Sequence, residues 1–322
     1  MNTPFLSSTQ NRRFPRSAFS LVEILVSISL LSFIVLGLLL MFNQTQRAFR
    51  GSMSQTDMLE SGRIVTDMLA REIEQTCPAG DQPYYGSGIY DHANFFAELS
   101  PTISTPFEQK LPGSAALRMN VVHRFFFVSR ENQDWIGTGY VVLTNRQGGE
   151  VGTLYRFSSS RRPPFSDYDL ATNFLGNINV ALDALRNNLP VTNLSRVAEG
   201  VVHLQVRAFA PNGRPLLPFI NSSNLVVQMP NGAYAEVGGT YWNLPAGMTT
   251  RPELAGCYFA DRAVPGSVEI EVGMLEQNIL GRYKALAGNT AAQRDYLSDR
   301  VGNVHVFRQR IPIRNVNPSV YP

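Results

Sequence analysis

An uncharged apolar segment near the N-terminus limits the possible folds of this chain more than any other feature. No charged residue occurs between Ile24 and Gln46, and Ile24–Phe42 contains only Ile, Leu, Val, Phe and Met apart from three serines and one glycine. A helix that rises about 1.5 Å per residue nearly spans a hydrocarbon core of about 30 Å over this length. The segment therefore predicts a membrane anchor. A cleaved signal peptide is disfavoured because no small-residue cleavage pattern follows Phe42.

The charges around this segment predict its orientation. Residues 1–18 contain Arg12, Arg13 and Arg16 and no acidic residue, and these three arginines account for the formal net charge of +3. Positive charge before a membrane helix keeps that end in the cytoplasm, so the rest of the chain is expected on the opposite side of the membrane. Because the remainder is formally neutral, it has no net field to attract nucleic acid, and no nucleic-acid partner is expected.

Glu23 is the residue that an ordinary membrane anchor does not explain. An ionised carboxylate at the start of an apolar helix is costly and usually has a partner. The stretch Ser17–Val26, which reads SAFSLVEILV, resembles the class III signal of type IV prepilins and pseudopilins. That signal has a short basic leader, a small residue, a Phe-Thr-Leu-hydrophobic-Glu pattern and an apolar helix. Ala18 departs from it, since the family mostly has Gly there. The alternative is a plain anchor with a chance glutamate.

The resemblance implies a processing route and a role for Glu23. A prepilin peptidase would cut between Ala18 and Phe19 and methylate the new amine of Phe19. Glu23 would then pair with the N-terminal ammonium of a neighbouring subunit inside a filament. The implied partners are the prepilin peptidase, other pilin or pseudopilin subunits, an inner-membrane assembly platform and membrane lipid.

A helical period continues beyond the apolar segment. Apolar or small residues recur at spacings of three and four, at Met58, Gly62, Val65, Leu69 and Ile73. This pattern indicates an amphipathic helix, which Pro78 ends. The sequence thus predicts one helix over Phe19–Thr76, with Gly37, Gly51 and Gly62 as weak points.

The remaining chain predicts a β-rich domain. Alternation and turn residues favour strands at Leu117–Ser129, Gly139–Thr144, Gly152–Ser158, Val201–Phe209, Leu225–Val237 (turning at Pro230-Asn231-Gly232), Ser267–Val272 and Asn303–Ile313. Helices are expected at Asp167–Arg186 and Leu275–Arg300, and an extended loop with short elements at Ala79–Leu117. Two stretches, Arg196–Arg207 and Ala263–Val272, resemble strands of the larger minor subunits of type IV pili and type II secretion systems.

These observations predict an α+β fold, in which a long N-terminal transmembrane and amphipathic helix packs on a mainly antiparallel β-sheet domain. The expected parts are residues 1–18 as a prepilin leader, 19–43 as the transmembrane helix, 44–77 as its amphipathic continuation and 78–322 as the periplasmic domain.

Few residues suggest chemistry. Cys77 and Cys257 leave two alternatives open, a disulfide on the oxidising side of the membrane or two buried free thiols. The four histidines, His92, His123, His203 and His305, lack metal-ligand spacing, and His203 is expected to be solvated on the polar face of its strand. We find no nucleotide-binding or metalloprotease motif, so no catalytic residue, cofactor or metal is expected.

Aromatic residues in Gly/Pro-rich stretches are the remaining candidates for a binding surface. They are Tyr84, Tyr85, Tyr90, Phe95, Phe96, Tyr241 and Trp242. They either form a binding surface or cover the core of their own domain.

The function that the resemblance implies is structural, that of a minor pilin or pseudopilin in a type IV pilus or a type II secretion filament. The alternative is a membrane-anchored periplasmic binding or adhesion module that never enters a filament. An anchored enzyme is the third hypothesis.

Overall fold

The computed structural model describes residues 20–78, 93–100, 107–111, 117–144, 149–162, 169–216, 219–220, 225–227, 235–237, 257–260 and 262–317. The chain divides into two compact units, Met1–Met53 and Ser54–Pro322.

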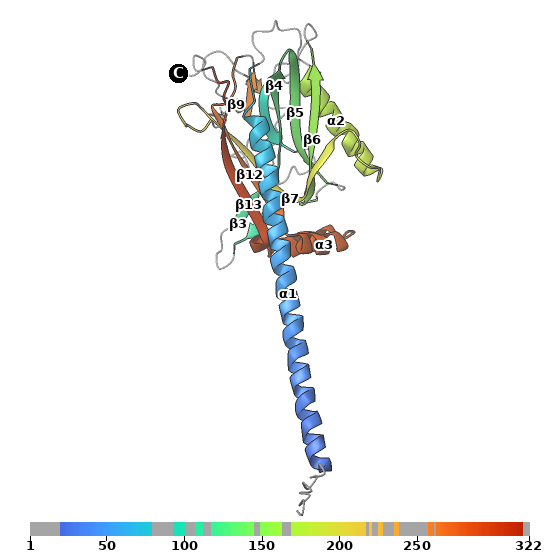
Figure 1. Ribbon diagram of the computed structural model, residues 1–322. Coiled ribbons are helices and arrows are strands. Elements are labelled where there is room, and N and C mark those ends of the chain that lie inside the picture. Colours follow the sequence, from blue (N-terminus) through green and yellow to red (C-terminus); the bar gives the residue numbers. More distant parts are fainter. Residues whose placement is uncertain are drawn as a thin grey trace, which may run out of the picture. The chain divides into compact units, whose positions relative to one another are not determined.

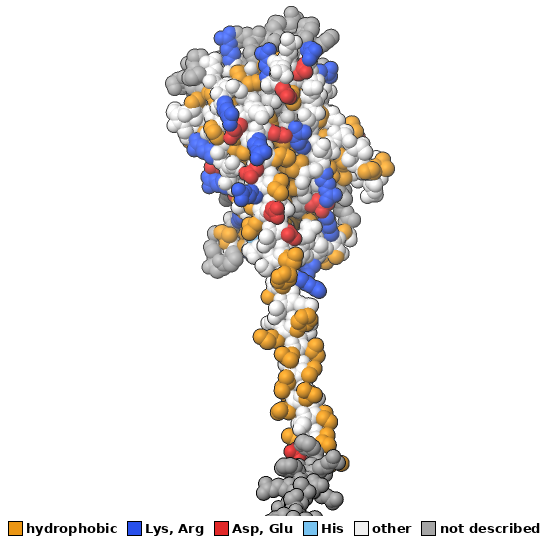
Figure 2. All heavy atoms as spheres, viewed as in Figure 1, with side chains coloured by type: hydrophobic (Ala, Val, Ile, Leu, Met, Phe, Trp, Pro, Cys, Tyr) orange, Lys and Arg blue, Asp and Glu red, His pale blue; other side chains and the backbone are white. Residues whose placement is uncertain are grey.

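The first unit contains the apolar part of helix α1 (Leu21–Ile73), which begins in this unit and ends in the second. Its hydrophobic side chains are exposed, as Figure 2 shows along the visible face. By length and composition this helix can cross a membrane. The expected anchor segment is therefore present as a helix with an apolar surface that no protein core covers.

The second unit is built on an eight-stranded sheet in the order β11-β1-β4-β5-β6-β7-β12-β13 (Figure 1). Every neighbouring pair is antiparallel. In chain order the strands are β1 (Ala93–Leu99), β4 (His123–Glu131), β5 (Asp134–Leu143), β6 (Gly152–Arg161), β7 (Ser195–Phe209), β11 (Cys257–Ala260), β12 (Ser267–Leu275) and β13 (Val304–Pro312).

Smaller elements complete the described part of this unit. They are the hairpin of β2 (Phe107–Lys110) and β3 (Leu117–Asn120), and a three-stranded sheet of β8 (Phe219–Ile220), β9 (Leu225–Val227) and β10 (Ala235–Val237). The helices are α2 (Asp169–Arg186), α3 (Gln277–Ala285) and α4 (Thr290–Ser298), and a 3-10 turn η3 (Val301–Asn303) precedes β13.

Both faces of the sheet are covered because successive strand residues point to opposite sides. On one face the end of α1 packs its apolar stripe, which runs from Met58 to Ile73, against Phe125, Tyr140 and their neighbours. On the other face α2 contributes Phe174 to a second core, which also includes Phe126 of β4. A continuous run of aromatic residues in β4 thus serves two cores.

Glycine is needed where α2 crosses β5. A Cβ at Gly139 would lie 2.5 Å from the ring of Phe174, and one at Gly137 would lie 2.9 Å from Leu170. Contacts this short do not occur between unbonded carbons, so the two glycines provide the space in which α2 is seated.

The predicted fold class is confirmed, with local differences. The strands expected at Gly139–Thr144 and Gly152–Ser158 pair as parts of β5 and β6, and β9 pairs with β10 within the expected Leu225–Val237. α1 has no break at Gly37, Gly51 or Gly62, but it ends at Ile73, before the expected Thr76.

The short elements expected within Ala79–Leu117 include β1, which lies between β11 and β4 in the sheet. Two local predictions were wrong. The single strand expected at Leu117–Ser129 is two strands, since β3 pairs with β2 outside the main sheet and β4 pairs with β1 and β5 inside it. The expected helix at Leu275–Arg300 is two helices, since the chain turns at Gly288, where φ is +123°, a conformation that glycine adopts readily.

Candidate functional site

The start of α1 is the first candidate site. The Ser20 hydroxyl accepts a hydrogen bond of 3.2 Å from the backbone N–H of Glu23, which caps the first turn. Between Ser20 and Gln46, Glu23 is the one charged residue, and all the residues around it are exposed. The predicted cleavage and methylation residues, Ala18 and Phe19, lie outside the described residues.

The other polar groups of the apolar helix are satisfied within it. The hydroxyls of Ser27, Ser29, Ser32 and Thr45 each donate to a carbonyl of the preceding turn at 2.7 to 2.9 Å. These bonds lower the cost of placing the hydroxyls in hydrocarbon. The carboxylate of Glu23 has no comparable hydrogen bond, because within the described residues no side chain donates to it. It is the group in this helix that would gain most from a partner of positive charge.

The end of α1 is held to the sheet by hydrogen bonds of Glu72 as well as by the packing of its apolar stripe. Glu72 accepts from the Tyr140 hydroxyl at 2.5 Å and from Arg156 Nε at 3.0 Å. Burial, together with the hydrogen bond to Glu72, raises the pKa of Tyr140. A strong bond to a half-buried carboxylate therefore ties the helix to β5 and β6. The sequence analysis missed this contact, because only the fold brings these residues together.

The two cysteines are free thiols. Cys257 belongs to the core under α1, whereas Cys77 packs against the core under α2, so the sheet separates them. The disulfide alternative is therefore not realised in this structure. Burial raises the pKa of Cys77 to about 11 and that of Cys257 to about 12, which keeps both thiols protonated and poorly nucleophilic.

The expectation that His203 is solvated was wrong, since only 3% of the residue is exposed. Its Nδ1 accepts the backbone N–H of Val121 at 3.0 Å, and His123 Nδ1 likewise accepts from Val206 at 3.1 Å. Both rings thus pair backbone groups where the segment before β4 crosses β7. Among the described residues no group of three His, Cys, Asp or Glu side chains is arranged to hold a metal ion.

The aromatic residues are now partly accounted for. Phe95 and Phe96 are buried in the two cores, so they cover the interior of their own domain. The five Tyr and Trp residues named with them lie outside the described residues.

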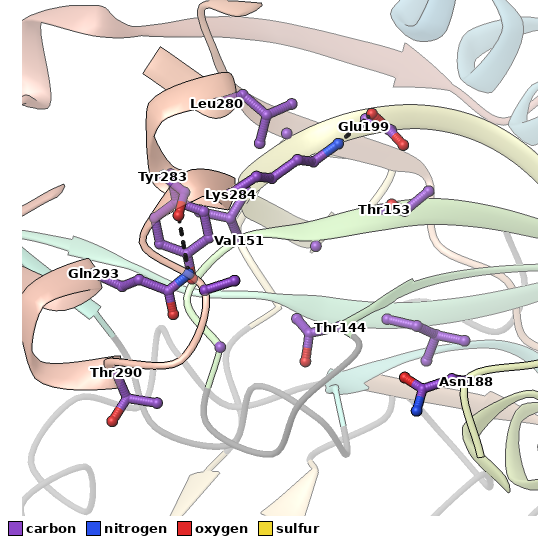
Figure 3. Close-up of a pocket in the computed structure, with 15 residues that line it drawn as sticks. Thr144, Val151, Thr153, Asn188, Glu199, Leu280, Tyr283, Lys284, Thr290 and Gln293 are labelled. Atoms are coloured by element: carbon purple, nitrogen blue, oxygen red, sulfur yellow. Dashed lines mark hydrogen bonds and ion pairs between the residues drawn. The ribbon is translucent and has the colours of Figure 1, made fainter. Parts of the chain in front are cut away.

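A pocket of about 480 Å³ lies between α3, α4, the segment that follows α2, the end of β5, the start of β6 and the middle of β7 (Figure 3). This volume is in the range of small-molecule sites. Its polar lining consists of Thr144, Thr153, Asn188, Glu199, Tyr283, Lys284, Thr290 and Gln293. Its apolar wall includes Leu143, Val151 and Leu280.

The charges of this pocket are already paired. Lys284 Nζ donates to Glu199 at 2.8 Å, and Arg196 also contacts Glu199. The hydrogen bond from Lys284 lowers the pKa of Glu199. Apart from this ion pair, the polar groups of the described lining are hydroxyls and side-chain amides, which can offer hydrogen bonds to a ligand. The arrangement suits binding of a small polar molecule. Sequence reasoning missed it, because five separate segments form it.

Comparisons with protein-family models, with curated proteins and with solved structures find no match.

Proposed function

We propose that this chain is a membrane-anchored structural subunit of the type IV pilin and pseudopilin kind. Glu23 carries the proposal, because it is a lone carboxylate on an exposed apolar helix that begins at Leu21. Such a charge costs free energy in a bilayer unless it meets an opposite charge. The N-terminal ammonium of a neighbouring subunit, exposed after cleavage between Ala18 and Phe19, would supply it.

The end of α1 supports the same role. A subunit that is pulled from a membrane into a filament must transmit force from its anchor to its domain. The stripe of α1 and the bonds of Glu72 to Tyr140 and Arg156 hold the helix to the sheet by both apolar and polar contacts. The subunit would serve a type IV pilus or a type II secretion system, with the second unit in the periplasm.

Replacement of Glu23 by Val tests this proposal. The change removes the charge and makes membrane insertion easier by roughly 2–3 kcal/mol, so the membrane level should be normal. We expect loss of the variant from sheared filaments or from complexes with other subunits. Ser32→Val is the matched control, because it removes a polar group of the same helix that is bonded to Ile28 O. Equal incorporation of the two variants would contradict charge pairing.

Mass spectrometry of the membrane fraction tests the processing step. The mature chain should begin at Phe19 with a methylated amine and retain its anchor. Ala18→Leu should block cutting by its bulk, whereas Ala18→Gly, which gives the residue usual in the family, should speed it. A mature N-terminus downstream of Phe42 would exclude this route.

The pocket supports a second candidate function, a membrane-anchored periplasmic binding module. Its volume and its set of hydroxyl and amide groups are what such a module needs. The two functions differ in their need for Glu23. A plain anchored module should keep full activity as Glu23→Val, whereas a filament subunit should lose it.

A further inference from the structure

Among the described residues, no strand pairs with the outer edge of β13, the last strand of the sheet. β13 has nine residues, ends the strand order and pairs with β12 along its whole length without a register shift. The strand at the opposite end, β11, has four residues. A long, regular edge presents unpaired backbone groups to which another strand can bond.

The register shows which backbone groups of β13 point outward. The N–H of Ile313 donates to Gly266 O at 3.1 Å. In an antiparallel pair the inward and outward residues alternate, so Phe307, Gln309 and Ile311 bond to β12. The N–H and C=O groups of the intervening residues Val306, Arg308 and Arg310 point away from the sheet. Within the described residues no further backbone bond joins these three residues to another segment.

The charged side chains of β13 do not close this edge. Natural edge strands are often protected by charges that project past them. Here Arg308 is held over the sheet by Glu269 at 2.8 and 2.9 Å. Arg310 donates to Ser267 at 3.0 Å, and its guanidinium lies 4.0 Å from the ring centre of Phe209. Both guanidinium groups are turned toward the strands behind them.

We propose that β13 binds an extended acidic segment of another protein as an added strand of this sheet. The backbone groups of Val306, Arg308 and Arg310 supply the hydrogen bonds. The charge of this face supplies the selectivity. Arg207 and Arg308 share the single carboxylate of Glu269, and within the described residues Arg310 has no carboxylate partner, so positive charge is in excess beside the outer edge. A partner with acidic side chains at alternate positions would place them beside both arginines on one face. The proposal does not rest on the filament role.

Amide hydrogen exchange of the full-length chain in detergent micelles tests the proposed edge. In the free protein the outward amides of Val306, Arg308 and Arg310 should exchange faster than the inward amides of Phe307 and Gln309. The probe is a blocked peptide of alternating Thr and Glu residues, as long as β13. It should slow the outward amides at least about tenfold, as expected for one added backbone bond each. Unchanged outward exchange at saturating peptide would overturn the proposal.

Two matched comparisons separate the strand from its charge. Val306→Pro removes an outward N–H without removing a bond to β12, and proline is tolerated on edge strands. It should weaken binding of the Thr-Glu peptide about tenfold, whereas Val306→Thr keeps the N–H and should bind as the wild type does. A Thr-Lys peptide of equal length should not bind. Equal binding by the two variants, or by the two peptides, would overturn the proposal.

The filament role can fail without affecting this result. Glu23→Val leaves β13 unchanged, so this variant should bind the Thr-Glu peptide with the affinity of the wild type. If the outward amides of this variant are protected by the peptide while its incorporation into filaments is normal, the edge site stands and the charge-pairing role falls.

Discussion

Acid should destabilise the second unit through His203. The ring is buried, its Nδ1 accepts the N–H of Val121, and its Nε2 lacks a hydrogen-bond partner. Burial lowers the pKa of His203 to about 3, and the positive charge of Arg118 adds to the effect. Glu271 lies 3.6 Å from Nε2, but desolvation outweighs this contact, and the folded state keeps the ring neutral.

The sign and size of the effect follow from proton linkage. The unfolded chain protonates this histidine near pH 6.5, whereas the folded chain does so only near pH 3. Between these values the unfolded state binds more protons, so stability is lost as the pH falls. At about 1.36 kcal/mol per pH unit, His203 should cost about 2 kcal/mol of unfolding free energy between pH 6.5 and pH 5.

The assay compares the wild type with His203→Asn. The Asn side-chain oxygen can replace Nδ1 as the acceptor for Val121, but it does not titrate. Denaturant unfolding of the full chain in detergent, followed by the fluorescence of the buried Trp135, gives the stability at pH 7.5 and pH 5. The loss between the two values should be about 2 kcal/mol smaller in the variant than in the wild type. Equal losses in both proteins would refute the reasoning.

Three further predictions concern the α1 contacts and the thiols. Gly62→Ala places a Cβ 2.1 Å from the ring of Phe307, so it should cost about 1–3 kcal/mol of unfolding free energy in spite of the better helix propensity of Ala. Addition of Phe307→Leu should recover part of this loss, and no recovery would contradict the proposed contact. Glu72→Gln should cost about 2 kcal/mol, because it weakens two bonds to a carboxylate, and unchanged denaturant midpoints would speak against it. Without reductant, Cys77 and Cys257 should both be alkylated in denaturant but slowly in the folded chain, as mass spectrometry can show, and a mass without two alkyl groups in denaturant would indicate a disulfide.

The sequence predicted those features that depend on local periodicity. The apolar run, the spacing of the stripe from Met58 to Ile73 and the alternation in β7 were each readable, because neighbours along the chain share one helix face or one strand face. The need of Glu23 for a partner followed from its apolar surroundings, whereas the kind of partner came from the resemblance to prepilins. The fold class followed from these elements together.

The tertiary structure decided what covers each face and which strands are neighbours. His203 lies on the polar side of its strand, yet the segment before β4 crosses there and buries it. The sequence indicated short elements around β1 without locating this strand, because its strand character comes from pairing with β4 and β11, which are distant in sequence.

The same limit applies to the candidate sites. The pocket gathers residues from Leu143 to Gln293, and the open edge of β13 exists only because the strand order ends there. Sheet order and side-chain burial are long-range properties, and a residue's neighbours along the chain do not specify them.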